Sequence, residues 1–380
     1  MLKALTIPFT PAKQWNAILK SLENETEGAE ALINKKLLVE LLNIIIYQPH
    51  KFSEIPGGYS NDTYHYLADD LVLRFPKPFN PLHRNQSIEV ENLRRARSFN
   101  LTPLTIIANY SKCLLLVTQF ISNYQTFTSN DFLNPLNLTA LADLVKKLHY
   151  SQSYFEKNPE TALSFIDKSS KSFKNIISIF NRSDYIIIEK LDAIKALLAK
   201  FPVVKRPSHG DLHHFNLIKK DGVMQLIDWE LSSVEDPAND IARFFCVTDL
   251  NNEQKQIFLN AYKNSFGIIL SEINIESLKQ RIQLFEPLNY FSIVAWAKYA
   301  IQFYNDEKRT LLQETITNYS EKTAETLKNI DIPYIKSQIK YFQPQENKLS
   351  FTKAYFSFFK LTSENEPKIL PSKQILATLP

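Results

Sequence analysis

The chain has 380 residues, which excludes a single small core and predicts two lobes or domains. Hydrophobic residues make up 44% and charged residues 22% of the chain, which is typical of a globular enzyme and excludes a disordered protein. The formal net charge of +4, from 44 basic and 40 acidic residues, is close to balanced and does not indicate a nucleic-acid partner.

Cysteine content and hydropathy indicate where the protein works. Only two cysteines occur, Cys113 and Cys246, which argues against a disulfide scaffold and favours a reducing compartment. The N-terminus lacks the continuous apolar segment of a signal peptide. The longest apolar stretch, residues 37–47, contains Glu40 and Asn43 and is far shorter than the ~20 residues of a membrane span. We therefore expect a cytoplasmic protein without a membrane span.

The first elements in chain order are a helix and two strands. Apolar residues recur every three to four positions over 29–47, and Pro49 ends this predicted helix. Alternating residues then predict strands over Thr63–Leu67 and Leu71–Phe75, joined by a short turn.

Glycine is scarce in this chain, yet a Gly57-Gly58 pair stands just before the first of these strands. Glycine lets a backbone approach a phosphate closely, so the segment is predicted to form a flap over the phosphates of a nucleotide. We assign Gly58, Ser60 and Asn61 to nucleotide binding on this basis.

A further helix is expected from about Leu82 to Phe99, followed by strands around Leu104–Ala108 and Cys113–Phe120. Helical patterns dominate after that point. The chain is thereby divided into an N-terminal helical extension, a nucleotide-binding lobe, a catalytic and substrate-binding lobe, and a C-terminal extension without an assigned role: residues 1–48, 49–122, 123–330 and 331–380.

Arg74 near the end of the second strand is a candidate for holding nucleotide phosphates, although an exposed strand arginine would have the same pattern. Its expected partner is a carboxylate on the following helix, either Glu89 or Glu91. These two residues are about 200° apart around a helix, so only one can face inward. Glu89 lies four residues before Leu93 on the predicted buried face, so we assign Glu89 as the partner and expect Glu91 to face solvent.

The last strand before the helical part ends at Gln119-Phe120-Ile121. Backbone groups of Gln119 and Ile121 are predicted to bind the edge of an adenine. An ordinary strand end would have the same sequence pattern.

Three polar residues form the central constellation of the chain. Asp211 follows His209-Gly210, Asn216 comes five residues later, and Asp228 ends the apolar strand 224–227. One carboxylate can accept a proton from a hydroxyl, while an amide and a second carboxylate can hold Mg²⁺ on a nucleotide. Each residue alone could cap a turn, but the three together predict an ATP-dependent phosphotransferase.

The histidines of this segment are not expected to act in catalysis or metal binding. His209 is predicted to pack under the loop and fix it by a hydrogen bond. His213 and His214 are adjacent, and adjacent loop residues rarely converge on one metal ion.

Aromatic residues gather on one predicted helical face near residue 300, among them Trp296 and Tyr299. Core packing explains such a face equally well. The alternative is a wall for a quaternary ammonium substrate, which cation–π attraction would stabilise by ~0.5–2 kcal/mol per ring.

Two segments resemble the catalytic core of the aminoglycoside phosphotransferase/choline kinase superfamily. They are His-Gly-Asp-Leu-His-x-x-Asn at 209–216 and Leu-Ile-Asp-Trp-Glu at 226–230. Asp240-Ile241-Ala242 and, upstream, Val72-Leu73-Arg74 are similar to the choline/ethanolamine kinase branch. The resemblance covers residues 50–305.

The resemblance implies an α+β, bilobal, protein-kinase-like fold with a small antiparallel-sheet N-lobe and a larger, mostly helical C-lobe. It implies Asp211 as catalytic base, Asn216 and Asp228 as Mg²⁺ ligands, and Glu230 close to the metal. The implied cofactors are ATP and Mg²⁺. In that branch an arginine often stands at the position of Arg74.

One position departs from the pattern of choline kinases. Those enzymes commonly carry an acid that helps to hold the cationic head group, and Val247 stands at that position here. The nearest acid is Asp249, which we assign to the substrate site together with Glu230, Trp296 and Tyr299.

The sequence thus predicts a kinase that phosphorylates a small alcohol, with choline or a related amino alcohol as the first candidate. An aminoglycoside or thiamine phosphotransferase is the alternative within the enzyme class. A kinase-like binding module without catalysis is the alternative outside it, but that would require a lost catalytic or metal residue, and all three are present. The oligomeric state stays open.

Overall fold

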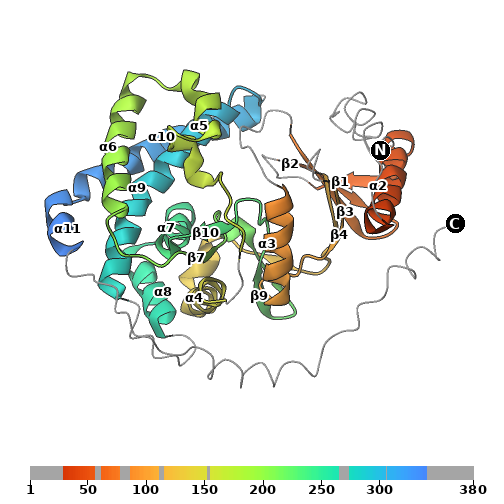
Figure 1. Cartoon of the computed structure of the whole chain (residues 1–380), viewed down its shortest axis with the longest axis horizontal. Helices are drawn as coiled ribbons and strands as arrows, with labels where there is room; N and C mark the ends of the chain where they lie inside the picture. Colours follow the sequence, from red (N-terminus) through yellow and green to blue (C-terminus); the bar gives the residue numbers. More distant parts are fainter. Residues whose placement is uncertain are drawn as a thin grey trace. The chain divides into compact units, whose positions relative to one another are not determined.

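The computed structural model describes residues 29–55, 61–77, 86–110, 115–151, 155–264, 274–304 and 306–339. Along these residues a small antiparallel sheet comes first and a largely helical part follows (Figure 1). The α+β fold with a sheet-containing N-terminal part, which the sequence predicts, is therefore confirmed. Gly58 and Ser60 lie outside the described residues.

The first sheet has five strands in the order β1-β2-β3-β5-β4, with each neighbouring pair antiparallel. The strands are β1 Phe52–Glu54, β2 Asn61–Tyr66, β3 Leu71–Pro76, β4 Ile106–Tyr110 and β5 Leu115–Gln119. Each strand that the sequence predicts in this region is present, with bounds that differ by at most two residues.

Strand β3 has two different faces because successive side chains of a strand point to opposite sides. Leu71, Leu73 and Phe75 are buried in a hydrophobic cluster on one side. Helix α2, Ala29–Tyr47, contributes leucines to the same cluster at helical spacing. Arg74 therefore points to the opposite side of the sheet, away from α2.

Helix α3, Gln86–Ser98, connects the sheet to the helical part of the chain. Leu93 and Ala96 are buried in the large core cluster that the later helices form. The chain just after α3 is also fixed, because the backbone N–H of Leu226 donates to the carbonyl of Leu101 at 2.8 Å. These contacts fix the position of Glu89, which lies one turn before Leu93.

The helical part surrounds one large apolar core. Its helices are α4 Pro135–His149, α5 Lys171–Ile176, α6 Arg182–Leu198, α7 Pro237–Thr248, α8 Asn252–Asn264, α9 Ile275–Ala300, α10 Asp306–Asn329 and α11 Ile332–Ile339. Short 3₁₀ helices are η1 Pro49–Lys51, η2 Ser129–Leu133, η3 Ala162–Ile166, η4 Ile177–Ile179 and η5 His214–Asn216. None of the helices in the described parts of the chain is long and apolar enough to cross a membrane.

Two small antiparallel sheets lie in this part of the chain. Strands β6 Gln125–Thr126, β8 Leu217–Lys220 and β9 Val223–Leu226 form one sheet in the order β6-β8-β9, and β7 Arg206–Ser208 pairs with β10 Ser233–Glu235. Strands β8 and β9 lie within the segment from Asp211 to Asp228, and β7 and β10 come before and after it.

The hairpin between β8 and β9 is closed by only two residues, Asp221 and Gly222, because Lys220 pairs with Val223. Both residues have positive φ angles, of 51° and 80°. A two-residue hairpin turn with two positive φ angles is the type that Asp-Gly favours. The turn fixes the register of β9 and so determines where the chain reaches Asp228.

Candidate active site

Gly210 allows the sharp turn that leads from β7 to Asp211. Its φ angle is +80°, and a Cβ atom at this position would lie 2.1 Å from the carbonyl oxygen of Leu231. Both the backbone conformation and the space therefore require glycine. The chain between His209 and Asp211 is held directly against the segment that follows Asp228.

The carboxylate of Asp240 anchors this turn. Its Oδ2 accepts a hydrogen bond from the backbone N–H of His209 at 2.7 Å, and its Oδ1 accepts one from Gly210 at 2.8 Å. Asp240 lies in the first turn of α7 and is 1% exposed. His149 of α4 contacts Oδ2 through Nε2 at 3.1 Å, and its Nδ1 lies 2.8 Å from the hydroxyl of Tyr262. The loop and α4 thus meet α7 at one buried carboxylate, and α8 is linked to it through His149.

Burial alone would raise the pKa of Asp240, but its pKa lies below the ordinary value. The contact with His149 and the hydrogen bond from the Gly210 backbone favour the charged form. The anchor is therefore an ionised carboxylate, which makes stronger hydrogen bonds to backbone N–H groups than a neutral acid would.

Asp211 itself is surrounded by donors. Its Oδ1 lies 3.0 Å from Nε and 2.9 Å from Nη2 of Arg243, which is three residues after Asp240 on α7. Its Oδ2 lies 3.2 Å from Nε2 of His213 and 3.4 Å from Nδ2 of Asn216. Burial would raise the pKa of Asp211, but the charges of His213 and Arg243 hold it well below its usual range. Asp211 is therefore a charged, oriented acceptor.

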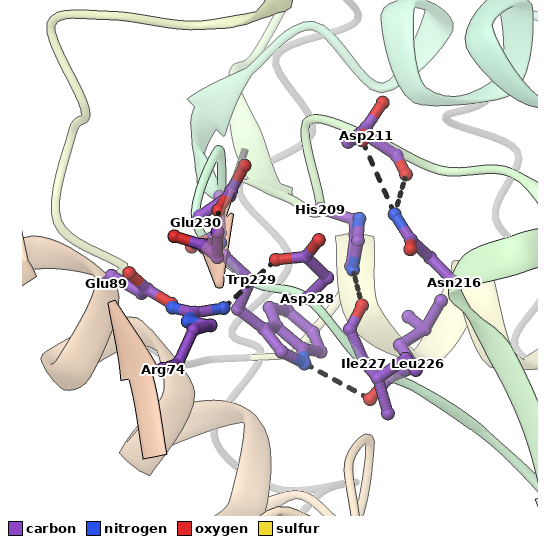
Figure 2. A network of polar contacts seen from close by, with 12 residues as sticks. Arg74, Glu89, His209, Asp211, Asn216, Leu226, Ile227, Asp228, Trp229 and Glu230 are labelled. Carbon is purple, nitrogen blue, oxygen red and sulfur yellow. Dashed lines mark hydrogen bonds and ion pairs between the residues drawn. The ribbon is translucent and has the colours of Figure 1, made fainter. Parts of the chain in front are cut away.

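Asn216 is oriented by the same loop. Its Nδ2 donates to the backbone carbonyl of Asp211 at 2.9 Å, and its own backbone carbonyl accepts from the N–H of Ile227 at 3.0 Å. Because the amide nitrogen is turned to Asp211, the amide oxygen lies on the other side of the group (Figure 2). That oxygen is the atom of Asn216 that can meet a metal ion.

Asp228 has a left-handed backbone conformation, with a φ angle of 62°. Its neighbours are held firmly: His209 contacts the carbonyl of Ile227 through Nε2 at 2.9 Å, and Trp229 donates from its indole N–H to the carbonyl of Leu226 at 3.2 Å (Figure 2). The Asp228 side chain remains 37% exposed. Strained conformations of this kind persist where the surroundings impose them, which is common in functional sites.

His209 lies where the sequence places it, packed under the loop and fully buried. Burial lowers the pKa of its imidazole, so the ring is neutral. Its ring lies 4.8 Å from that of Trp229. The role of His209 is to hold the chain before Asp228 and not to transfer protons.

Arg74 joins the sheet to this loop. Its guanidinium donates to Glu89 of α3 through Nη2 and to Oδ1 of Asp228 through Nη1 at 3.1 Å (Figure 2). Glu91 faces the other way and pairs with Arg95 at 2.8 Å. The structure therefore places Glu89, and not Glu91, beside Arg74.

A second contact joins the sheet to the segment after Asp228. Nδ2 of Asn61 in β2 donates to Oε2 of Glu230 at 3.0 Å, and Glu230 is buried. The structure thus brings residues predicted to bind the nucleotide, Arg74 and Asn61, into contact with residues predicted to bind metal or substrate, Asp228 and Glu230.

Gln119 and Ile121 lie at the end of β5, as expected, and line a cavity of about 430 Å³ together with Phe120. The other walls come from the segment after α3 and the β8–β9 hairpin, including Asn100 and Gln225. Asp211, Asn216 and Asp228 are not among its lining residues, so the constellation does not line this cavity.

The remaining predicted substrate residues have other surroundings. Trp296 packs against the hydrophobic core, and the ring of Tyr299 lies 5.0 Å from that of Phe303. Asp249 ends α7, is largely exposed and pairs with Lys322 at 2.6 Å. Their roles in binding an acceptor stay predictions.

Other aromatic residues lie on the Arg243 side of the site. The rings of Tyr290 and Tyr319 are 5.8 Å apart, and burial raises the pKa of Tyr319 while the charge of Arg243 lowers it. The sequence analysis missed both tyrosines and also Arg243. Asp240 and Arg243 are one turn apart and share a face of α7, but this spacing alone does not show that the face meets Asp211.

A sheet-containing part and a helical part that meet where Arg74 contacts Asp228 are typical of protein-kinase-like phosphotransferases. Residues 116–315 match the family described as choline/ethanolamine kinase. The chain belongs to the choline/ethanolamine kinase family.

Individual relatives are distant. The chain is 26% identical to the protein LicA of Haemophilus influenzae over 201 residues, which are 51% of this chain and 72% of that protein. The choline kinase LicA from Streptococcus pneumoniae has a similar fold, with a TM-score of 0.61 and 18% identity over 78% of this chain and 99% of that one. A structure of LicA in complex with AMP has a TM-score of 0.60 and 17% identity, covering 77% of this chain and 98% of that one.

The two glycines at φ +80° provide a matched pair for testing the turn before Asp211. Gly222→Ala has open space around the new Cβ and should cost about 1 kcal/mol, from backbone strain alone. Gly210→Ala adds the collision with Leu231 and should cost about 3 kcal/mol or more. Denaturant unfolding of both variants measures the difference, and equal losses would show that the close approach to Leu231 is not a constraint.

Replacing the anchor by Asp240→Asn should destabilise the protein by about 3 kcal/mol, because an amide cannot replace a buried charge that accepts several hydrogen bonds. Since the folded pKa of Asp240 is lowered, its contribution is fully present above the unfolded value of about 3.9 and is lost as the pH falls through the folded pKa. The stability gap between wild type and variant should therefore be constant near neutral pH and shrink in acid.

Asp249→Asn, at the exposed end of the same helix, is the control and should cost less than about 1 kcal/mol. Chemical denaturation from pH 7 down to pH 3.5 measures the free energy of unfolding of the wild type and of both variants. A gap for Asp240→Asn no larger than that for Asp249→Asn would disprove the anchoring role.

Proposed function

We propose that this protein transfers the γ-phosphoryl group of ATP to the hydroxyl of a small alcohol, with choline or a related amino alcohol as the acceptor. The observation that carries the proposal is the charged Asp211 carboxylate, fixed beside Asn216 in a loop that also determines the position of Asp228. Membership in the family supports the reaction, and the choline kinase LicA from Streptococcus pneumoniae supports the choice of acceptor.

Asp211 orients the acceptor hydroxyl and receives its proton as the new bond to phosphorus forms. Phosphoryl transfer has a loose transition state with little covalent chemistry for the protein, so catalysis depends on position and on charge. The contacts of Arg243, His213 and Asn216 fix the carboxylate before the acceptor arrives.

Asn216 and Asp228 have the donors that Mg²⁺ prefers. The amide nitrogen of Asn216 contacts Asp211, so its amide oxygen can accept a metal ion. The carboxylate of Asp228 is partly exposed. Two protein oxygens suit Mg²⁺, which usually keeps several waters and binds substrate phosphates. The bound ion would neutralise charge that develops on the transferred group. Glu230 follows Asp228 by two residues and adds a further carboxylate beside them.

Arg74 would bind the phosphates of the nucleotide. It contacts Asp228 at 3.1 Å, so phosphates that share a metal with Asp228 would lie within reach of the same guanidinium. Glu89 keeps the guanidinium in place through a buried ion pair. Asn61, together with Gly58 and Ser60, would contribute to phosphate binding, and the backbone of Gln119 and Ile121 would bind adenine. The AMP complex of LicA supports a nucleotide site in this fold.

Acceptors with many positive charges fit less well. Arg243 places a cation 2.9 Å from the base, and an aminoglycoside would add several more charges close to it. We therefore place aminoglycosides behind amino alcohols, while thiamine, which carries one fixed positive charge as choline does, stays an alternative acceptor. The scarcity of cysteine supports a cytoplasmic location, where ATP is available.

An acceptor screen tests the proposed function directly. The full chain is incubated with Mg·ATP and, separately, with choline, ethanolamine, thiamine and an aminoglycoside, and the phosphorylated product is identified by mass spectrometry. We expect phosphocholine or the phosphate ester of another amino alcohol, with one ADP formed for each product molecule. Formation of ADP without any phosphorylated acceptor would contradict the proposal, and a phosphorylated aminoglycoside or thiamine would correct the acceptor.

Asp211→Asn should lower kcat by about 10²–10⁴-fold, because the amide cannot accept the proton of the hydroxyl. The Kd for Mg·ATP, measured by calorimetry, should change by less than about threefold, since this carboxylate is assigned to the acceptor and not to the nucleotide.

The matched control is Asp221→Asn in the exposed β8–β9 turn, which should keep wild-type kcat. Full activity of Asp211→Asn would disprove its role as base. A wild-type protein that does not bind Mg·ATP would favour the alternative of a kinase-like protein without catalysis.

A further inference from the structure

The two carboxylate oxygens of Asp211 are held in different ways. Oδ1 accepts from both Nε and Nη2 of Arg243, at 3.0 and 2.9 Å. Among the described residues, Oδ2 has only the longer contacts with His213 at 3.2 Å and Asn216 at 3.4 Å. Hydrogen bonds between two charged groups are stronger than neutral ones, and hydrogen bonds weaken with length. Oδ1 is therefore fixed, and Oδ2 is the oxygen that can exchange its partner.

Arg243 makes no hydrogen bond or ion pair with a residue other than Asp211 in the described part of the chain. Its third guanidinium nitrogen, Nη1, is buried and has no hydrogen-bond partner there. The side chain is 15% exposed, so its charge is largely removed from water. A buried arginine normally satisfies more of its donors, and an unsatisfied buried donor costs free energy. The position of Arg243 is therefore explained by Asp211 and not by packing alone.

Helix α7 makes the placement of Arg243 rigid. Asp240 and Arg243 are one turn apart on this helix and contact successive parts of the same loop: Asp240 contacts the backbone at 209–210, and Arg243 contacts the Asp211 side chain. Phe244 and Phe245 beside them are fully buried in the core. The same helix therefore positions both the loop backbone before Asp211 and the Asp211 carboxylate.

We propose that Arg243 is a positioning residue that fixes Oδ1 of Asp211 so that Oδ2 receives the acceptor hydroxyl. This inference rests on the proposed function. The hydroxyl displaces the weak contacts of Oδ2 with His213 and Asn216, while the ion pair with Arg243 stays closed. As the hydroxyl oxygen bonds to phosphorus, its proton passes to Oδ2 and ADP leaves.

The opposite role for Arg243 gives opposite kinetics. If the ion pair blocked the base in the resting protein, its removal would raise kcat. If Arg243 positions the base, its removal lowers kcat, because misplacement of a catalytic group by about 1 Å can cost 10²-fold. The nucleotide contacts of Arg74 and Asp228 are on other elements, so the KM for ATP should be unchanged in either case.

The experiment compares Arg243→Ala, Arg243→Lys and wild type in the full chain, with the acceptor that the wild type phosphorylates. Arg243→Ala should lower kcat by about 10–100-fold with the KM for ATP within about twofold. Arg243→Lys should recover part of this loss, because it restores the charge but not the planar pair of donors on one oxygen. Added guanidinium or methylguanidinium at low millimolar concentration should raise the kcat of Arg243→Ala and leave that of Arg243→Lys unchanged.

Arg281→Ala is the matched structural control, because Arg281 makes a similarly buried ion pair with Asp236 at the start of α7 without contacting Asp211. It should lose thermal stability and keep wild-type kcat below its Tm, without a response to guanidinium. An Arg243→Ala variant with unchanged or higher kcat, or one that loses activity only as it unfolds, would overturn the positioning role. A wild type that phosphorylates no acceptor would overturn the proposed function, and this inference with it.

Discussion

The candidate site depends on the hydrogen bonds that the ionised carboxylate of Asp240 accepts. It is buried at the start of α7, and it accepts hydrogen bonds from the two backbone N–H groups that precede Asp211. Leaving those N–H groups unpaired in the core would cost free energy, so the loop can take its sharp turn only where such an acceptor is present. Gly210 makes the same turn possible from the other side, through the close approach to Leu231. Helix α7 thereby determines where the loop that carries Asp211 begins.

From this anchor the geometry extends to the other residues of the site. Asn216 binds the backbone N–H of Ile227 and His209 contacts its carbonyl, and the next residue, Asp228, has a left-handed conformation. Arg74 reaches Asp228 from the sheet and is itself held by Glu89, whose helix is packed into the large core. The residues proposed to bind the nucleotide and the acceptor are therefore linked through these hydrogen bonds and the short segment from Ile227 to Asp228. The proposed reaction needs such coupling, because it depends on position more than on covalent chemistry.

Local pattern was sufficient to predict contacts between residues that lie close together in sequence. The Asp211, Asn216 and Asp228 constellation is contained in one loop and one hairpin, and helical spacing alone selected Glu89 over Glu91. Arg243 could not be predicted in this way, because its contact with Asp211 depends on how α7 docks against the loop. Helical spacing also grouped Trp296 with Tyr299 but could not show what lies opposite them, and Trp296 packs against the core. Periodicity identifies a face of a helix, whereas tertiary packing decides what covers that face.

The most direct test of this account is a crystal structure of the full chain with Mg²⁺ and a non-hydrolysable ATP analogue. The account predicts Mg²⁺ bound by the amide oxygen of Asn216 and a carboxylate oxygen of Asp228, with Arg74 in contact with the phosphates. Oδ2 of Asp211 should face the terminal phosphate, while Oδ1 keeps its two contacts with Arg243. A nucleotide bound elsewhere, or a metal that ligates neither Asn216 nor Asp228, would contradict the account.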